Sequence, residues 1–137
     1  MLVDKTTFYE SVETNLVMCE NGTFISDAIA DDQGLIVKTP KGLVVISGCA
    51  HRGIINMLLH AQNITEEKRI HLVLGGTHLF KASEERIHKT IAALKELKVQ
   101  KIGVSHCTGS SVSALLAREF PDGFFANNAG TCIEIAS

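Results

Sequence analysis

Three of the six histidines lie in short loops of small residues, and each loop follows an apolar run. His51 lies in Ser-Gly-Cys-Ala-His-Arg-Gly, His78 in Gly-Gly-Thr-His-Leu and His106 in Ser-His-Cys-Thr-Gly. Imidazole is a common ligand of zinc and other transition metals. If the apolar runs are neighbouring parallel strands, about 4.8 Å apart, imidazoles at their carboxyl ends can converge on one ion or on two. The pattern therefore predicts a divalent metal site at His51, His78 and His106.

The same loops could bind a small anion. Their glycines let the backbone approach a ligand closely, and the helices expected after the loops would direct their N-termini toward it. Arg52 could hold the charge of a phosphorylated or carboxylated substrate, or it could face water at the start of a helix. Thr108, next to the third loop's cysteine, is a further candidate for substrate contact.

Two of the four cysteines, Cys49 and Cys107, lie in the first and third of these loops. A small apolar filler is the commoner role of a free cysteine. Their position nevertheless leaves open a metal or substrate contact, and also a cysteine nucleophile activated by a histidine across the loops, such as Cys49 with His106.

The other polar candidates are assigned to structure or solvent. Asp31 and Asp32 indicate a solvated turn, with a role as metal ligand or general base as the alternative. His60 and His88 fall within expected helices, and His71 opens a strand.

Hydrophobic periodicity predicts the elements that position the loops. Residues 16–26 alternate around Asn21-Gly22 and predict a β-hairpin. Residues 35–38 and 43–46 predict a second hairpin, whose latter strand is apolar and buried on both faces. After these hairpins strands alternate with helices. Strands are expected at 71–74, 101–104, 124–125 and 132–135, and helices from about 54, after a cap at Ser83, and after a cap at Ser110 or Ser111. This order predicts an α/β fold with a mostly parallel sheet and hairpin edges.

Composition limits the class of protein. The 137 residues are 45% hydrophobic and 20% charged, with a net charge of −2, so we expect one globular domain over residues 1–137 and no nucleic-acid partner. No apolar run is long enough to span a bilayer, and the polar N-terminus lacks a signal-peptide core. We therefore expect a soluble cytoplasmic protein with free thiols and no membrane partner.

The three histidine segments, in this order, resemble the metallo-β-lactamase superfamily, and in particular its branch of dihydropterin phosphate synthase-like proteins. Asp31-Asp32-Gln33 and the strand at 42–46 agree with the resemblance, which extends from about Asn15 onward. It implies an αββα sandwich made of two similar halves.

The resemblance also implies roles for the histidines. His51 matches a ligand of one metal and His106 a ligand of a second, with zinc expected and manganese or iron as alternatives. Many members have a bridging aspartate where this chain has Gly-Gly-Thr-His, so His78 could replace it or contact substrate.

The family's H-x-H-x-D-H cluster, which supplies most ligands of the first metal, does not occur in these residues. The chain thus looks like the C-terminal half of the sandwich, with no catalytic residue that can be named. Three functions stay open: a metal-binding half of a hydrolase or transferase acting on a small anion, a non-catalytic metal- or anion-binding module that oligomerises, and a cysteine-dependent enzyme. The expected partner is a second copy of the chain, packed sheet against sheet, or a separate N-terminal half.

Overall fold

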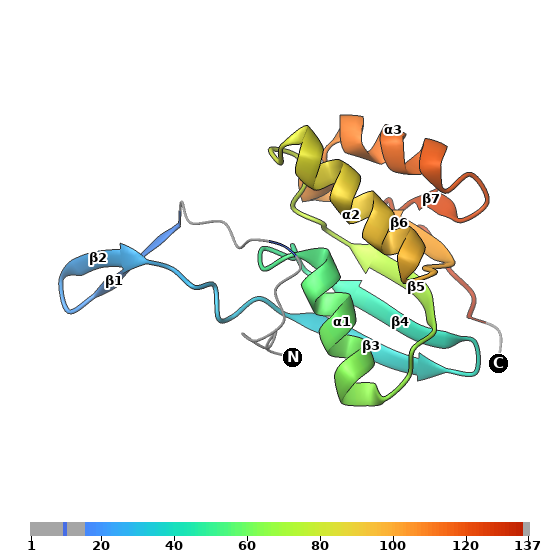
Figure 1. The fold of residues 1–137 in the computed structure, drawn as a ribbon, viewed down its shortest axis with the longest axis horizontal. Coiled ribbons are helices and arrows are strands. Elements are labelled where there is room, and N and C mark those ends of the chain that lie inside the picture. The colour runs from blue at the N-terminus through green and yellow to red at the C-terminus, as the bar shows by residue number, and fades with distance from the viewer. Residues whose placement is uncertain (1–9, 11–15, 136–137) are drawn as a thin grey trace.

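A five-stranded sheet forms the centre of the computed structural model, which describes Glu10 and residues 16–135 (Figure 1). The strand order is β3-β4-β5-β6-β7. The edge strand β3 is antiparallel to β4, and the rest are parallel: β3 (Gly34–Thr39), β4 (Gly42–Ser47), β5 (Ile70–Gly75), β6 (Lys101–Val104) and β7 (Phe124–Ala126). The predicted α/β fold with a mostly parallel sheet is confirmed.

Three helices connect the parallel strands in turn: α1 (Ile54–Thr65), α2 (Glu84–Glu96) and α3 (Ser110–Glu119). A short 3-10 turn, η1 (His106–Thr108), precedes α3. Because successive crossovers run in one direction and have one hand, their helices pack on the same face of the sheet. Side chains from all three helices meet the strands in one core, which includes Val45, Val73, Ile102, Leu58, Leu94 and Leu116.

The opposite face of the sheet is also apolar but only partly covered. The register aligns Leu35 with Ile46, Val37 with Val44, and Val44 with Leu72. Val44 and Leu72 are buried, whereas Leu35, Val37 and Ile46 are 59%, 40% and 37% exposed. The expectation that the strand at 43–46 is buried on both faces is therefore wrong at Ile46.

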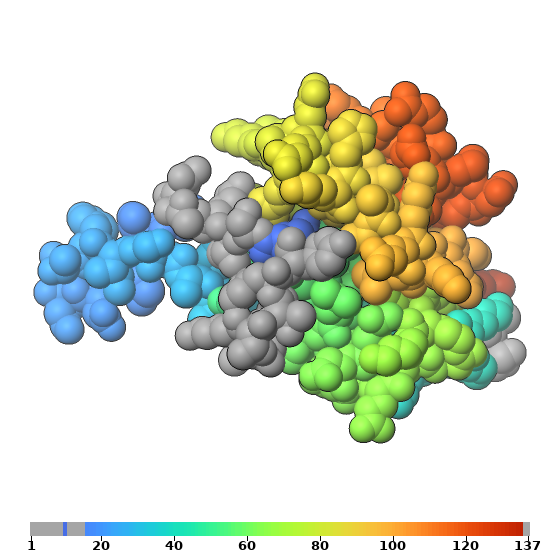
Figure 2. Space-filling view, viewed as in Figure 1, coloured from blue at the N-terminus to red at the C-terminus, as the bar shows by residue number. Residues whose placement is uncertain are grey.

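The first predicted hairpin is confirmed as a separate two-stranded sheet, β1 (Val17–Glu20) and β2 (Thr23–Ser26). Asn21 and Gly22 connect the strands with φ angles of 51° and 79°, as a type I′ turn requires. The hairpin projects from the rest of the chain (Figures 1 and 2), and all its strand residues are exposed.

Two sequence predictions about the C-terminal third are wrong. Gly109, with φ of 80°, is the N-cap of α3, so Ser110 is already helical and neither Ser110 nor Ser111 caps it. Residues 132–135 form no strand, because no strand in the described part of the chain pairs with them. Their alternating isoleucines, Ile133 and Ile135, are half-buried. The cap at Ser83 is confirmed, since its hydroxyl accepts a hydrogen bond from the Arg86 N–H at 3.2 Å. No helix in the described part of the chain has the length and apolar character needed to cross a membrane.

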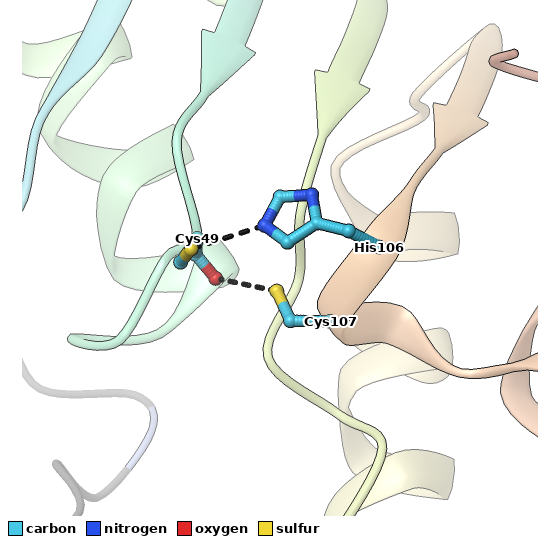
Figure 3. A group of neighbouring side chains, drawn as sticks. All are labelled: Cys49, His106 and Cys107. Carbon is cyan, nitrogen blue, oxygen red and sulfur yellow. Dashed lines mark hydrogen bonds between the residues drawn. The ribbon is translucent and has the colours of Figure 1, made fainter.

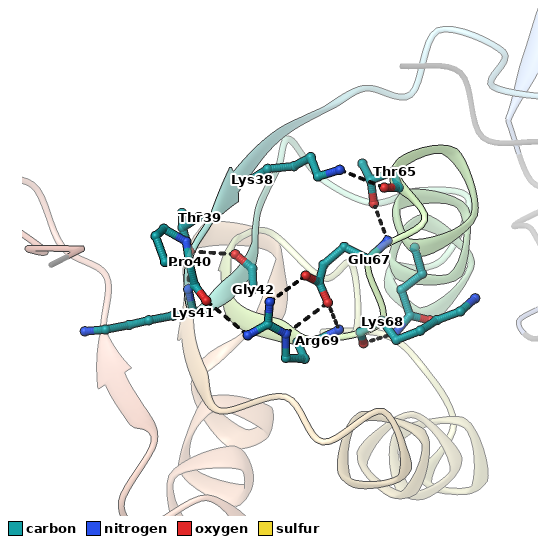
Figure 4. Close-up of polar contacts among 10 residues, drawn as sticks. Lys38, Thr39, Pro40, Lys41, Gly42, Thr65, Glu67, Lys68 and Arg69 are labelled. Carbon is teal, nitrogen blue, oxygen red and sulfur yellow. Dashed lines mark hydrogen bonds and ion pairs between the residues drawn. The ribbon is translucent and has the colours of Figure 1, made fainter. Parts of the chain in front are cut away.

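The amino ends of β4 and β5 are joined by an exposed polar cluster (Figure 4). The Arg69 guanidinium donates to the Glu67 carboxylate at 2.7 and 3.1 Å and to the Pro40 carbonyl at 3.0 Å. Lys38 donates to the Thr65 carbonyl at 2.9 Å. Hydrogen bonds from the Arg69 side chain, and then from its backbone N–H, lower the pKa of Glu67 from 4.5 to about 2.

We expect the Glu67 pair to stabilise the protein at neutral pH and to lose this effect in acid. A carboxyl whose folded pKa is lowered contributes stability above its unfolded pKa of 4.5, and the contribution disappears as pH falls toward about 2. The difference in unfolding midpoint between the wild type and Glu67→Gln should shrink over this interval and with added salt. The effect should be small because the pair is exposed. A midpoint difference that is constant from pH 7 to pH 2 would contradict this assignment.

Candidate metal centre

The loops that follow β4, β5 and β6 lie side by side at one edge of the sheet. This placement follows from the parallel register of three neighbouring strands. Backbone hydrogen bonds join the loops: the Gly76 N–H donates to the Gly48 carbonyl at 3.0 Å, and the Ser105 N–H to the Gly75 carbonyl at 3.0 Å. The three histidine loops predicted from the sequence therefore share one edge.

Two glycines at the end of β5 allow this close approach. Gly75 has φ of 110°, and a side chain there would overlap the backbone carbonyl of Ser47. A Cβ on Gly76 would lie 2.6 Å from the Cys107 sulfur and 2.7 Å from both the Gly48 oxygen and the His106 Cε1. The contact between the first and third loops across β5 therefore requires glycine at both positions.

The first and third loops bring two thiols and an imidazole together (Figure 3). The Cys49 Sγ lies 3.0 Å from the His106 Nε2, and the Cys107 thiol donates to the Cys49 carbonyl at 3.5 Å. The Sγ atoms of both cysteines and a ring nitrogen of His106 all lie within 4.8 Å of one another. These are the donor types that zinc prefers in proteins. Cys49, His106 and Cys107 form what we call the thiol cluster.

Opposing effects act on the Cys107 thiol. Burial raises its pKa above 9.0, whereas a hydrogen bond from the His78 backbone N–H, at 3.3 Å, lowers it, and the neighbouring Cys49 raises it further. The net direction is upward, so the thiol is held neutral in the absence of a cation.

The other two predicted histidines form a separate pair. The rings of His51 and His78 lie with their centroids 4.1 Å apart and tilted by 36°. Both side chains are half-buried, and the buried Nδ1 of His51 has no hydrogen-bond partner among the described residues. A buried imidazole nitrogen without a partner is available to a ligand. The structure thus divides the three histidines into a stacked pair and a single imidazole among thiols.

Backbone strain is concentrated in these loops. Seven described residues other than glycine have positive φ, and three of them are Ala50 at 55°, His78 at 49° and His106 at 24°. Such conformations are unfavourable for residues with a side chain and persist where surrounding contacts impose them. The loops are therefore held in shapes that local sequence would not select.

Asp32 and Arg52 support the first loop from within the protein. The Asp32 carboxylate accepts a hydrogen bond from the Arg52 N–H at 2.9 Å, and the Arg52 guanidinium donates to the Ala28 carbonyl at 2.7 Å. Both residues are buried. The interpretation of Asp32 as a solvated residue is therefore wrong. The alternative that Arg52 faces water is wrong as well. Asp31 is exposed, as expected.

The remaining candidates lie around the loops. Thr108 is fully buried and accepts a hydrogen bond from the Thr77 hydroxyl at 3.0 Å, which links the second and third loops. His71 is buried beside Gln100, with 2.8 Å between its Nδ1 and the amide oxygen. His60 is half-buried in α1 and His88 is exposed on α2.

Sequence reasoning missed one supporting residue, Glu10. Its buried carboxylate accepts a hydrogen bond from the Ile55 N–H, in the first turn of α1, at 2.8 Å. The other oxygen accepts from the Thr90 hydroxyl at 2.9 Å and lies 3.8 Å from the Arg86 guanidinium on α2. The N-cap of α1, Gly53, has no side chain to do this. No local pattern could have identified Glu10, because its partners are 45 to 80 positions away.

A hollow of about 310 Å³ opens beside His106. Its lining combines the third loop and the start of α3 with the segment after β7, and includes Ser105, Gly109, Ser110, Ser113, Asn127 and Asn128. The hollow offers uncharged polar groups to a ligand that reaches the exposed His106 imidazole.

Comparisons with known proteins agree with the resemblance found in the sequence. The chain is 38% identical over 96% of its length to 7,8-dihydropterin-6-methyl-4-(β-D-ribofuranosyl)-aminobenzene-5′-phosphate synthase of Methanocaldococcus jannaschii, of which it covers 45%. It is 33% identical over 74% of its length to an uncharacterized protein of the same organism, of which it covers 36%. No protein-family model matches.

A solved structure supports the same assignment. The crystal structure of a metal-dependent hydrolase of the β-lactamase superfamily superimposes with a TM-score of 0.82 at 40% identity. The match covers 88% of this chain and 47% of that one. The chain therefore spans about half the length, or less, of the proteins that it matches.

We expect Gly76→Ala to disrupt the contact between the first and third loops. The added methyl group would overlap Cys107, His106 and the Gly48 carbonyl, and such overpacking costs about 1–3 kcal/mol. Urea unfolding should show this loss. Gly48→Ala is the matched control, because a Cβ there meets only the Gln33 carbonyl at an ordinary 3.5 Å. Equal stability of the two variants would contradict the assigned role of Gly76.

Proposed function

Since this chain belongs to the metallo-β-lactamase superfamily, in the branch of the dihydropterin phosphate synthase-like proteins, we propose that it binds divalent metal at the carboxyl edge of its sheet. It would act there as the metal-binding half of a hydrolase or transferase whose substrate is a small anion. The observation that carries the proposal is that the His51–His78 pair and the thiol cluster around His106 lie on the loops after three neighbouring strands.

The residues at this edge fit a metal ion. The buried Nδ1 of His51 has no hydrogen-bond partner among the described residues, and the His106 Nε2 faces a thiol. Gly76 lets the donors approach one another, because a Cβ there would lie 2.6 Å from the Cys107 sulfur and 2.7 Å from the His106 Cε1. Imidazole and thiolate suit zinc better than the harder cations magnesium and calcium. We propose zinc as the ion, with manganese or iron as alternatives.

The side chains of these loops would have separate roles in binding the metal and in orienting its ligands. His51, His78 and His106 would hold one ion or two, and Ser105 would orient His106, since its hydroxyl lies 3.3 Å from the Nδ1 of that ring. A bound divalent ion supplies a Lewis acid and lowers the pKa of water. The hollow beside His106 would admit the substrate, with its anionic group near the amino end of α3.

Catalysis would require residues that are not among the 137 of this chain. The family's H-x-H-x-D-H cluster is not among them, and the most suitably placed carboxylate, Asp32, is engaged with the Arg52 backbone. We therefore propose that the chain binds metal by itself but turns over substrate only with a second half. A module that binds metal or an anion without catalysis is the corresponding alternative, and clear turnover by the metal-loaded chain alone would contradict both.

A second candidate function, a cysteine-dependent enzyme, is favoured by the distance of 3.0 Å between the Cys49 sulfur and the His106 Nε2. His106 could accept the thiol proton and so activate the sulfur as a nucleophile. The group that orients the imidazole is the Ser105 hydroxyl, which carries no charge to stabilise an imidazolium ion. This candidate also gives no role to Cys107, so we rank it below metal binding.

We expect the purified chain to bind zinc, and His106→Ala or His51→Ala to weaken binding about tenfold or more. Imidazole nitrogen competes for protons, so the affinity should fall in acid. His60→Ala and His88→Ala are the controls and should bind like the wild type. Calorimetric titration after dialysis against chelator measures the affinity, and unfolding without metal checks that each variant is folded. No saturable binding by the wild type at neutral pH would end the proposal.

We also propose that the exposed apolar sheet face packs against a second sheet, and that a second copy of the chain takes this place in the purified protein. Light scattering should therefore show a dimer at micromolar concentration. Leu35→Lys should shift it toward monomer, whereas Ile64→Lys, a similarly exposed position on α1, should not. A monomeric wild type, or equal effects of the two substitutions, would contradict this surface assignment.

A further inference from the structure

The fold brings together two cysteines that are 58 positions apart. Cys49 follows β4 and Cys107 follows β6, whereas Cys19 and Cys132 are exposed elsewhere. We propose that Cys49, His106 and Cys107 form a thiolate-containing site that selects a soft divalent cation, zinc above all, within this chain alone. The inference rests on the proposed function and deepens it: the two thiols would join His106 around one ion, and the His51–His78 pair would be left for another.

The distances in the cluster suit a tetrahedral ion. Ligand atoms around zinc, with bonds of about 2.0–2.3 Å, lie about 3.5–3.8 Å from one another. In the structure the Cys49 Sγ and His106 Nε2 are 3.0 Å apart, and no pair among the three donors exceeds 4.8 Å. Shifts of about 1 Å or less, within the range of side-chain rotation, would bring all three to coordination distance.

The atoms around the cluster prepare its donors. The His78 backbone N–H donates to the Cys107 sulfur at 3.3 Å, an interaction that favours a charged sulfur. The Ser105 hydroxyl lies 3.3 Å from the Nδ1 of His106, which leaves the Nε2 directed at Cys49. Metal-ligating histidines commonly have such a partner on the second ring nitrogen.

The donor set also determines the choice of ion. The cluster combines two sulfurs with one imidazole and includes no carboxylate, so it should discriminate against magnesium, calcium and manganese, which prefer oxygen. His106 is exposed and both cysteines are half-buried, which gives the ion a path from solvent. Three protein donors would leave a fourth position for water or substrate. Binding would exchange the two thiol protons for the cation and release them to the buffer.

Cobalt(II) and zinc alone can test the site on the full chain. We expect cobalt(II) to give thiolate-to-metal charge-transfer absorption in the near ultraviolet, and zinc to displace it. Cys49→Ser and Cys107→Ser should each remove this absorption and weaken zinc binding about tenfold or more. Cys19→Ser and Cys132→Ser are the matched controls and should leave both measurements unchanged. Unfolding of each variant without metal establishes that it is folded.

A measurement without substitutions gives a second test. Zinc should slow the alkylation of Cys49 and Cys107 in the wild type at least tenfold, as followed by mass spectrometry of peptides, and should leave Cys19 and Cys132 unaffected. If zinc binds but protects neither thiol, and only the histidine variants weaken binding, the inference is wrong and the proposed function stands. If neither zinc nor cobalt(II) binds, both are wrong.

Discussion

The contact between the first and third loops across the end of β5 is the constraint on which the candidate site depends. Strands on either side of β5 are two positions apart in the sheet, so side chains at their ends meet only if the middle strand occupies almost no volume there. Gly75 and Gly76 meet this condition, and the Gly48 and Gly75 carbonyls fix the spacing through backbone hydrogen bonds. The loops that carry the donor atoms are therefore held in place by main-chain contacts.

The sequence was sufficient to predict which loops meet and to name the pairing of Cys49 with His106 as one possibility, but not the pairing of His51 with His78. Alternating strands and helices determine the order of the parallel sheet, and this order places the three histidines at one edge. The stacking of His51 on His78 depends on loop conformations with positive φ, at Ala50 and His78, that no residue type signals. The burial of Asp32 was missed for a related reason, because its partner is the Arg52 backbone, which every sequence provides.

The two faces of the sheet differ in how far the chain covers them. On one face three successive helices complete a core with residues such as Leu58 and Leu94. On the other face Leu35 and Ile46 are exposed next to the buried Val44 and Leu72. The matched proteins are about twice as long as this chain or longer, and the chain covers less than half of each. A second sheet packed on this face would lie against the same strands that carry the candidate site.

The single carboxylate of Glu10 makes distant parts of the chain cooperative. One oxygen satisfies the start of α1, directly after the His51 loop, and the other binds Thr90 on α2. Local opening of α1 would therefore leave one buried Glu10 oxygen without its donor while the other stays bound to α2, and separation of α2 would do the reverse. Segments linked in this way open as one unit and exchange their amide protons together. Glu10 thus couples the start of α1, directly after the His51 loop, to the opening of α2.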